Sequence, residues 1–536
     1  MNVLAHQTSR RGFLQLTGAM GLAATLAATV SGCASRDNTT GTSQGPAGPL
    51  AKDGTLTAAI SYELGTNGYD PMSTSAALTI AANWHTMEGL TEIDPATRKT
   101  YPALARELPT ATGTSVDIAL RDGATFHDGS PVTADDVVFS FERVQDPANK
   151  SLYAQFIPFV DKVVKKDDRT VTLTLKHPTA VLAARLSVVK IVPKVAAADK
   201  KSFDAMPVGS GPYRMTDNGA SSKQIVFERF DKYTGPRPAR AKTMKWQIIP
   251  DAATRTNAIQ SKSVQVVDSV PYLSVDQLKA SSKVESVQGF GLLFAMFNHS
   301  SGNPFATKEN RQGFLTAIDM DKVVKTALLG QATPATSFLQ EGHPDYQRAK
   351  TVYTFDAAKA KDIFAKTGLK KIRMLCTDHD WVKKCTPIIA ESLKSAGVDV
   401  DFVEKKSADV YNTIDGKPEA YDVVLAPGDP SVFGNDPDLL LRWWYAGDTW
   451  TEQRMHWKGQ PSYTKVQELL QEALTATDTA AQKKTWGELF DLLSDELPLY
   501  PLFHRKSPTA WDPTTLVDFA PIALTGLSFV NVGSTK

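Results

Sequence analysis

Residues 120–144, LRDGATFHDGSPVTADDVVFSFERV, gather five carboxylic acids, one histidine and two Asp-Gly pairs in one short run. Such a cluster is either an active site or a piece of architecture. Asp122 and Asp128 each precede a glycine. Because glycine accepts positive φ and aspartate bonds to its own backbone, both pairs predict turns. Residues 124–127 between them, which end at His127, are predicted to form a short strand.

The second half of this stretch predicts the start of a helix. Thr133 and Asp136 match a capping box, in which the threonine caps the helix and the aspartate reaches back to its amide. Val132 and Val137 are spaced as a hydrophobic staple. Asp135 adds a second acid in the first turn, where the helix dipole favours negative charge. We therefore interpret the stretch as architecture rather than catalysis.

The same stretch resembles the signature of the family 5 extracellular solute-binding proteins, the dipeptide-, oligopeptide- and nickel-binding receptors of ABC importers. Further motifs of that family follow in the same order: PVGSGPY at 207–213, FERFDKY at 227–233, IPDA at 249–252, FN, PF and AID between 297 and 319, and a helix pattern at 355–368. The resemblance extends from about residue 54 to the C-terminus. It implies an α/β, two-lobed periplasmic-binding-protein-like fold (type II, cluster C) with an extra α/β domain in the first lobe.

The periodicity of the chain agrees with this fold class. It predicts strands at 55–62, 170–175 and 264–268, and helices at 78–90, 251–262, 463–475 and 480–493. Between residues 268 and 463, the segments 356–366, 372–376, 387–396 and 398–403 alternate as helix, strand, helix, strand. This alternation predicts a sheet with parallel neighbours and flanking helices.

The resemblance also implies the domain organisation. Lobe I would combine 54–84, 205–294 and 505–536, an extra domain would occupy 85–204, and lobe II would be 295–504. A chain of 536 residues suits two or three domains. Two adjacent connections between lobes permit bending and resist sliding, which suits a cleft that closes on a ligand.

The N-terminal residues predict export. SRRGFL at 9–14 is a twin-arginine pattern, and a weakly hydrophobic run follows at 16–30. VSGC, which ends at Cys33, resembles a bacterial lipobox. It implies a signal peptide at 1–32, a lipid on Cys33 and a flexible tether at 33–53. We therefore expect a protein anchored to the outer face of the cytoplasmic membrane. The alternative is an uncleaved membrane anchor.

Composition argues against several classes of protein. The formal net charge is +1, and loss of the two arginines in the signal peptide turns it to −1. Nucleic-acid binding needs a concentrated basic surface, so no nucleic-acid partner is expected. Three cysteines argue against a large metal cluster, and nine histidines show no paired spacing for a bare metal ion. We expect neither a metal nor a cofactor.

Two cysteines, Cys376 and Cys385, lie close together in CTDHDWVKKC. Outside the cytoplasm thiols tend to oxidise, so we predict a disulfide between them. Their spacing does not match a zinc pair. His379 lies between them, which leaves a metal site as the alternative.

The segment 421–430 predicts a strand that ends in a turn, and the resemblance makes it the ligand site. Peptide-binding members of the family carry a GW..D segment here. The corresponding candidates are Ala426, Pro427, Gly428 and Asp429. The resemblance implies that Asp429 pairs with the α-ammonium of a peptide, because an acid in a closed cleft is costly until a cation pairs with it. The alternative for Asp429 is an Asx-turn before Pro430.

Two departures from the family pattern bear on specificity. Ala426 replaces the family's tryptophan, and residues 377–384 contain no arginine where dipeptide receptors grip the ligand carboxylate. A lysine there supplies a point charge but not a bidentate fork. We therefore expect a specificity that is not strictly for dipeptides, and a longer peptide held through its backbone fits the pattern.

Aromatic side chains supply further candidates, because aromatic walls receive varied ligand groups. We select Trp381, Trp443 and Trp444 from a group that also includes Trp450 and Trp457. The helical pattern at 439–444 also suits core packing. The first lobe's opening loop faces the cleft in the resembled family, and its candidates are Tyr62, Gly65 and Tyr69.

The predicted function is that of a lipid-anchored receptor of an ABC importer. We expect a monomer that captures di- or oligopeptides between its lobes and delivers them, unchanged, to permease and ATPase subunits. Nickel chelates, haem and oligosaccharides are alternative solutes, and a peptide-binding surface protein without a transporter is an alternative role. A secreted enzyme is disfavoured, because the chain contains no H-E-x-x-H and no Walker loop.

Overall fold

The computed structural model describes residues 49–65, 68–110, 113–476 and 478–536. The predicted signal peptide, the lipidation site at Cys33 and most of the predicted tether lie outside the described residues. All described residues belong to one compact unit, 43–536. In this described part of the chain, no helix combines the length and the apolar character needed to cross a membrane.

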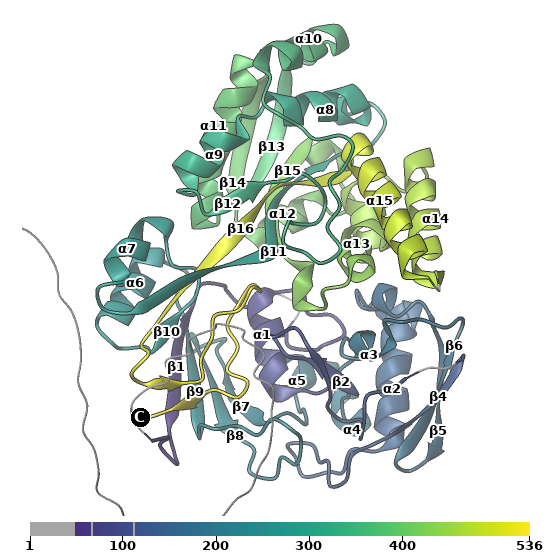
Figure 1. Ribbon diagram of the computed structural model, residues 1–536, viewed down its shortest axis with the longest axis vertical. Coiled ribbons are helices and arrows are strands. Elements are labelled where there is room, and N and C mark those ends of the chain that lie inside the picture. The colour runs from purple at the N-terminus through teal and green to yellow at the C-terminus, as the bar shows by residue number, and fades with distance from the viewer. Residues whose placement is uncertain (1–48, 66–67, 111–112, 477) are drawn as a thin grey trace, which may run out of the picture. The chain divides into compact units, whose positions relative to one another are not determined.

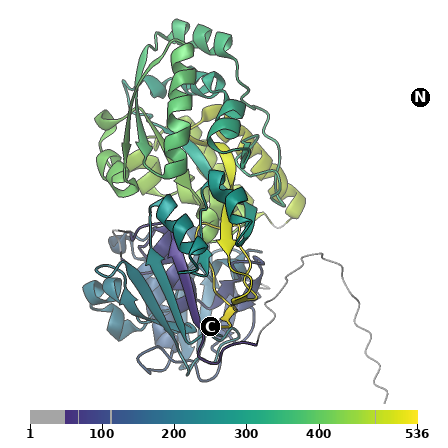
Figure 2. The same ribbon diagram turned by 90° about the vertical axis from the view of Figure 1, so that its left-hand side faces the viewer.

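A mixed sheet of eleven strands runs through the unit, and helices flank it, which confirms the predicted α/β class. Its strands in spatial order are β14 (Asp399–Lys405), β13 (Lys371–Thr377), β15 (Val423–Gly428), β11 (Lys283–Phe297), β16 (Leu499–Trp511), β10 (Val266–Val267), β1 (Thr55–Ile60), β9 (Thr243–Ile248), β8 (Gln224–Arg229) and β7 (Tyr213–Asn218), with β12 (Ala332–Pro334) paired to β16. The long strands β11 and β16 connect two groups of strands (Figures 1 and 2). We call the group of β1 and β7–β10 lobe I and the group of β12–β15 lobe II. The predicted domain boundaries themselves stay predictions.

Lobe I is organised around β1, which pairs in parallel with both β9 and β10. The strands predicted at 55–62 and 264–268 correspond to β1 and the shorter β10. The predicted helices correspond to α1 (Ala77–Thr86) and α6 (Ala252–Gln260). The smaller elements are α7 (Val275–Leu278), β17 (Leu516–Val517) and β18 (Gly533–Ser534).

Lobe II contains the predicted parallel neighbours, because β13 pairs in parallel with β14 and with β15. Its helices are α8 (Lys308–Ala317), α9 (Met320–Ala327), α10 (Ala357–Thr367), α11 (Asp380–Ser395), α12 (Ser407–Ile414), α13 (Pro437–Tyr445), α14 (Pro461–Thr475) and α15 (Thr479–Glu496). The helix predicted at 387–396 begins earlier, at Asp380. Val382 and Cys385 continue its buried face ahead of Pro387, so the proline lies inside the helix.

The extra domain carries a three-stranded antiparallel sheet of β4 (Ser115–Ala119), β6 (Thr170–Leu175) and β5 (Val160–Asp167). β6 has the predicted bounds, and α2 (Ala134–Gln145) packs against this sheet. The short elements nearby are β2 (Thr91–Ile93), β3 (Thr100–Pro102), α3 (Leu182–Arg185), α4 (Lys194–Ala197) and α5 (Lys200–Ala205).

The stretch quoted first is architecture, as predicted. α2 begins with the capping box: the Asp136 amide donates to Thr133 Oγ1 at 3.4 Å, and the Thr133 amide donates to Asp136 Oδ2 at 3.0 Å. The predicted strand at 124–127 is wrong. Two turns fold this short segment back on itself, and an isolated bridge between Thr125 and Pro131 is its only sheet-like pairing.

His127 belongs to the same architecture. Its Nδ1 accepts from the Gly209 amide at 3.3 Å, and its Nε2 lies 3.0 Å from the carbonyl oxygen of Gly211. Burial lowers the pKa of His127 to about 4, so the ring is neutral at pH 7 and Nε2 is the donor. His127 thus joins the quoted stretch to the PVGSGPY motif through two backbone hydrogen bonds.

Candidate functional site

A cavity of about 1270 Å³ lies between lobe I and lobe II. Lobe I lines it with the loop at 61–65, β16 contributes Arg505, and lobe II contributes residues within 378–384 and 427–433. Pockets for drug-sized ligands typically measure about 300–1,000 Å³. This cavity therefore has room for a ligand larger than most small molecules.

Asp429 stands at this cavity directly after β15. Its Oδ2 accepts from the amide of Thr525 at 2.8 Å and from the Thr525 hydroxyl at 2.9 Å, and its Oδ1 accepts from the Ser431 hydroxyl. Within the described residues, no lysine or arginine forms an ion pair with this carboxylate. The Asx-turn alternative is not observed, because the side chain makes no hydrogen bond to the backbone of the turn that starts at Pro430.

The rest of the candidate segment divides between cavity and core. Pro427 and Gly428 line the cavity, and a Cβ on Gly428 would come within 2.4 Å of Cζ2 of Trp444, so glycine is required there. Ala426 is wrong as a cavity residue. The alternation of β15 turns Val424 and Ala426 into the same buried apolar cluster, away from the ligand space.

Arg505 of β16 reaches the segment 377–384, which contains no arginine of its own. The guanidinium carbon of Arg505 lies 4.7 Å from the ring centre of Trp381, and its Nη2 donates to the Tyr62 hydroxyl at 3.3 Å. Arg505 is only 4% exposed, yet no carboxylate in the described part of the chain forms an ion pair with it. Sequence reasoning missed Arg505, because a charged residue inside a strand carries no local sign of what it faces.

The opening loop of lobe I meets His379 at the cavity. Tyr62 and Gly65 line it, and the ring centres of Tyr62 and His379 are 5.9 Å apart. Burial above all lowers the pKa of His379 to about 4, and in the part of the chain that the structure describes its buried Nδ1 has no hydrogen-bond partner. Tyr69 is wrong as a cavity residue: its ring is buried in the core of lobe I, and its hydroxyl donates to the carbonyl of Asn218 at 2.8 Å.

The predicted disulfide is also wrong. Cys376 on β13 and Cys385 on α11 are free thiols buried in the apolar core of lobe II, and Cys385 Sγ donates to the carbonyl of Trp381 at 3.2 Å. Burial raises the pKa of both thiols to about 12, so they stay protonated at neutral pH. The metal alternative around His379 is not observed, since no group of three or more His, Cys, Asp or Glu among the described residues could hold an ion.

The tryptophans predicted for the ligand site serve two purposes. Trp381, Trp443 and Trp444 all border the cavity, and so does Trp450, whereas Trp457 is buried in the core. Trp443 and Trp444 are also members of the apolar core, because α13 presents them inward. These two side chains therefore both line the cavity and pack in the core, which are the two roles that the sequence left open.

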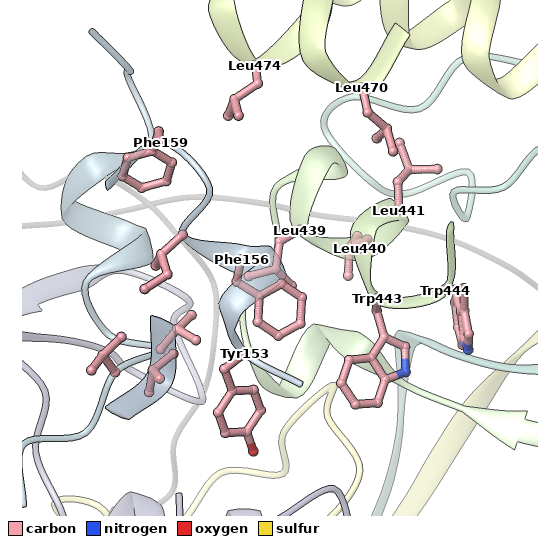
Figure 3. Packing of buried hydrophobic residues seen from close by; sticks show 14 of the residues in the cluster. Tyr153, Phe156, Phe159, Leu439, Leu440, Leu441, Trp443, Trp444, Leu470 and Leu474 are labelled. Atoms are coloured by element: carbon pink, nitrogen blue, oxygen red, sulfur yellow. The ribbon is translucent and has the colours of Figure 1, made fainter. Parts of the chain in front are cut away.

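Beside the cavity, the extra domain contacts lobe II in a buried seam, which we define by Phe156, Arg185, Asp436, Asp438 and Trp443. Arg185 is fully buried and donates to Asp436 through Nε (3.0 Å), to Asp438 through Nη2 (2.8 Å) and to the carbonyl of Phe156 through Nη1 (2.7 Å). The rings of Phe156 and Trp443 are nearly parallel, with centres 6.0 Å apart. Figure 3 shows the two side chains next to each other. The charged groups of the seam are thus paired with one another, and its rings pack against each other.

Comparison with known proteins supplies an independent finding. The family profile described as "Bacterial extracellular solute-binding proteins, family 5 Middle" matches residues 99–464. The glutathione-binding protein GsiB of Escherichia coli (strain K12) is 23% identical over 426 residues, which cover 78% of this chain and 82% of GsiB.

Two solved structures share the fold. The dipeptide binding protein of Pseudoalteromonas sp. SM9913, in complex with Met-Leu, aligns with a TM-score of 0.80 and 22% identity over 90% of this chain and 100% of its own. The oligopeptide-binding protein AppA of Bacillus subtilis, in complex with a nonapeptide, aligns with a TM-score of 0.80 and 18% identity over 91% of this chain and 100% of its own. The two-lobed fold that the sequence predicted is therefore confirmed.

Proposed function

The chain belongs to the bacterial extracellular solute-binding proteins of family 5, and from this premise we propose that it captures peptides between its lobes and delivers them unchanged to an ABC permease. The observation that carries the proposal is Asp429, a carboxylate at a 1270 Å³ cavity that forms no ion pair with a lysine or arginine among the described residues. A charge in a poorly hydrated cleft is costly until an opposite charge pairs with it. The free α-ammonium of a peptide supplies that charge.

The relatives support this ligand class. Two structural neighbours were solved with Met-Leu and with a nonapeptide, and GsiB is named as a glutathione-binding protein. The cavity volume favours a ligand longer than a dipeptide. A ligand that contacts both lobes binds their closed arrangement better than an open one and shifts the population toward it. That closed form is the state we propose to dock on the permease.

The test of this proposal removes the charge of Asp429. We expect Asp429→Asn to weaken the binding of free-amine peptides by at least about tenfold, because one partner of a desolvated pair is lost. Isothermal titration calorimetry measures the change, with peptides first identified by native mass spectrometry of the protein as purified. Equal affinities of wild type and variant, or equal binding of N-acetylated peptides, would exclude this role.

A matched control for this substitution is Asp217→Asn. Asp217 also accepts from a backbone amide, that of Gly219 at 2.9 Å, and from a serine hydroxyl, that of Ser222 at 3.0 Å. It stands on β7, away from the residues that line the cavity. We expect this variant to bind peptides as the wild type does.

We further propose that the protein works as a lipid-anchored monomer on the outer face of the cytoplasmic membrane. The twin-arginine pattern at 9–14 and the lipobox-like end at Cys33 support export and lipidation. We expect Cys33→Ala to move the protein from the membrane fraction to the soluble envelope fraction, measured by immunoblotting of both. Retention of the variant in the membrane would favour an uncleaved anchor.

A further inference from the structure

Asp429 and Arg505 flank the same point of the sheet. Leu292 of β11 pairs with Gly428 of β15 on one side and with His504 of β16 on the other. The next residues along, Asp429 and Arg505, therefore lie on either side of Gly291. With one strand between them, their backbones stand about 10 Å apart, which is two strand spacings.

A bulge in β11 shapes this point. Between the pairs Gln288–Lys506 and Leu292–His504, three residues of β11 stand opposite the single residue Arg505. A bulge of this kind bends the strand locally and re-aims the side chains beside it. Arg505 and Asp429 both line the cavity, so the two charges share one space although they come from different strands.

Gly291 keeps the space between the two charges open. A Cβ built on Gly291 would meet only the Asp429 carboxylate, with Oδ2 at 3.8 Å, which is ordinary contact. Gly291 therefore faces the same side as Asp429 and lines the cavity without filling it. Asp429 directly after β15, Gly291 of β11 and Arg505 of β16 thus lie next to one another at the cavity.

The two charges act on each other without being paired. Among the described residues no ion pair joins them, and no other charged group lies within ion-pair distance of either. Arg98 acts on Asp429, and Asp268 on Arg505, only from a longer distance. Burial lowers the pKa of Arg505, but the phenols of Tyr62 and Tyr272 and the Asp429 carboxylate raise it, and the net shift is upward. His379 lines the same cavity, and its buried Nδ1 has no hydrogen-bond partner among the described residues. An anionic group beside Arg505 and a cationic group beside Asp429 would satisfy all of these groups.

We propose that Asp429, Gly291 and Arg505 form a subsite for a ligand end that carries an ammonium and a carboxylate on the same carbon. This is the head group of a free α-amino acid or of a γ-glutamyl peptide. The ammonium pairs with Asp429 and the carboxylate with Arg505, with the ligand carbon over Gly291. An ordinary α-linked peptide presents an ammonium here but only an amide carbonyl to Arg505. The inference rests on the proposed function and narrows its ligand class.

The test compares two tripeptides of one composition, γ-Glu-Ala-Gly and α-Glu-Ala-Gly, by isothermal titration calorimetry. We expect the wild type to bind the γ-linked isomer at least about tenfold more tightly, because only its head group carries the ammonium and the carboxylate on the same carbon. Arg505→Gln should abolish this preference while changing the affinity for the α-linked isomer by less than about threefold. Arg214→Gln, at an exposed strand arginine outside the cavity, is the matched control and should keep the preference.

A second variant keeps the test decisive where Arg505→Gln fails to fold. Gly291→Val places a β-branched side chain, which suits a strand, over the floor of the subsite. It should weaken binding of the γ-linked isomer more than that of the α-linked isomer. Circular dichroism melts establish which variants are folded.

Three outcomes overturn the inference: equal or tighter binding of the α-linked isomer by the wild type, no measurable binding of the γ-linked isomer, or an equal loss for both isomers in Arg505→Gln. The proposed function fails separately, when Asp429→Asn leaves the affinity for every free-amine peptide unchanged. Peptide binding that depends on Asp429 but not selectively on Arg505 removes the inference alone.

Discussion

Two buried arginines, Arg185 in the seam and Arg505 at the ligand cavity, are satisfied in opposite ways. Arg185 in the seam is fully buried, and Asp436, Asp438 and a carbonyl oxygen receive its hydrogen bonds. Arg505 at the cavity is 4% exposed, and its guanidinium contacts the hydroxyls of Tyr62 and Tyr272 and the face of Trp381. A buried cation is stable only when an anion or several dipoles compensate it. A buried cation that anions or several carbonyl oxygens compensate is structural, whereas one with neither is a candidate for binding an anionic ligand group.

The largest expected effect is a difference in the free energy of unfolding between variants that lack Arg185 and variants that lack Arg505. Arg185→Ala leaves carboxylates buried without their cation, so we expect the free energy of unfolding to fall by about 3–5 kcal/mol. Arg505→Ala removes a cation that has no anionic partner, so we expect a loss of about 1 kcal/mol or less. Urea denaturation followed by circular dichroism measures both. A loss at Arg505 as large as that at Arg185 would contradict the comparison.

A third buried group avoids the need for a counter-ion by staying neutral. His85 of α1 is fully buried; its Nδ1 donates to the carbonyl of Ala81 at 2.8 Å, and its Nε2 accepts from the Phe529 amide at 2.9 Å. Burial lowers the pKa of His85 from 6.5 to about 4. Between these values the unfolded chain binds more protons than the folded protein, so stability falls as the pH falls.

We therefore expect His85 to contribute a loss of up to about 3 kcal/mol as the pH falls from about 6.5 to about 4. Urea denaturation at a series of pH values measures this loss. His85→Gln keeps a donor and an acceptor but does not titrate, so its stability should depend less on pH over this window. An unchanged pH profile in the variant would show that other groups cause the loss.

The smallest expected effect is the difference in the free energy of unfolding when either of two glycines that line the cavity is replaced. A Cβ on Gly428 would come within 2.4 Å of Trp444, which belongs to the packed core, whereas a Cβ on Gly291 meets only Asp429 at 3.8 Å. Overpacking typically costs about 1–3 kcal/mol, so we expect Gly428→Ala to lower the free energy of unfolding by that amount. Gly291→Ala should leave it within about 0.5 kcal/mol of the wild-type value. Equal losses would mean that the floor of the cavity is not open.

Sequence reasoning succeeded where the physical cause lies within a few residues. The Thr133–Asp136 capping box, the strict alternation of β6 and the helix–strand alternation before β15 depend on neighbours along the chain. It failed for Tyr69 and Ala426, which the family pattern placed at the ligand site and which packing turned into the core. It also failed for Cys376 and Cys385, because compartment chemistry does not reveal whether two nearby side chains face each other.

By itself the sequence determined the fold class and the start of α2, and it singled out Asp429 as the acid to test; export and lipidation stay predictions from the N-terminal motifs. Only the tertiary structure decided that Arg505 reaches Trp381, that Gly291 separates Arg505 from Asp429, and that Arg185 has both its anions. The physical reason is the separation along the chain over which each effect acts. Capping, periodicity and signal motifs act between residues close in the chain, whereas compensation of a buried charge depends on which distant strands and helices are brought together when the sheet forms.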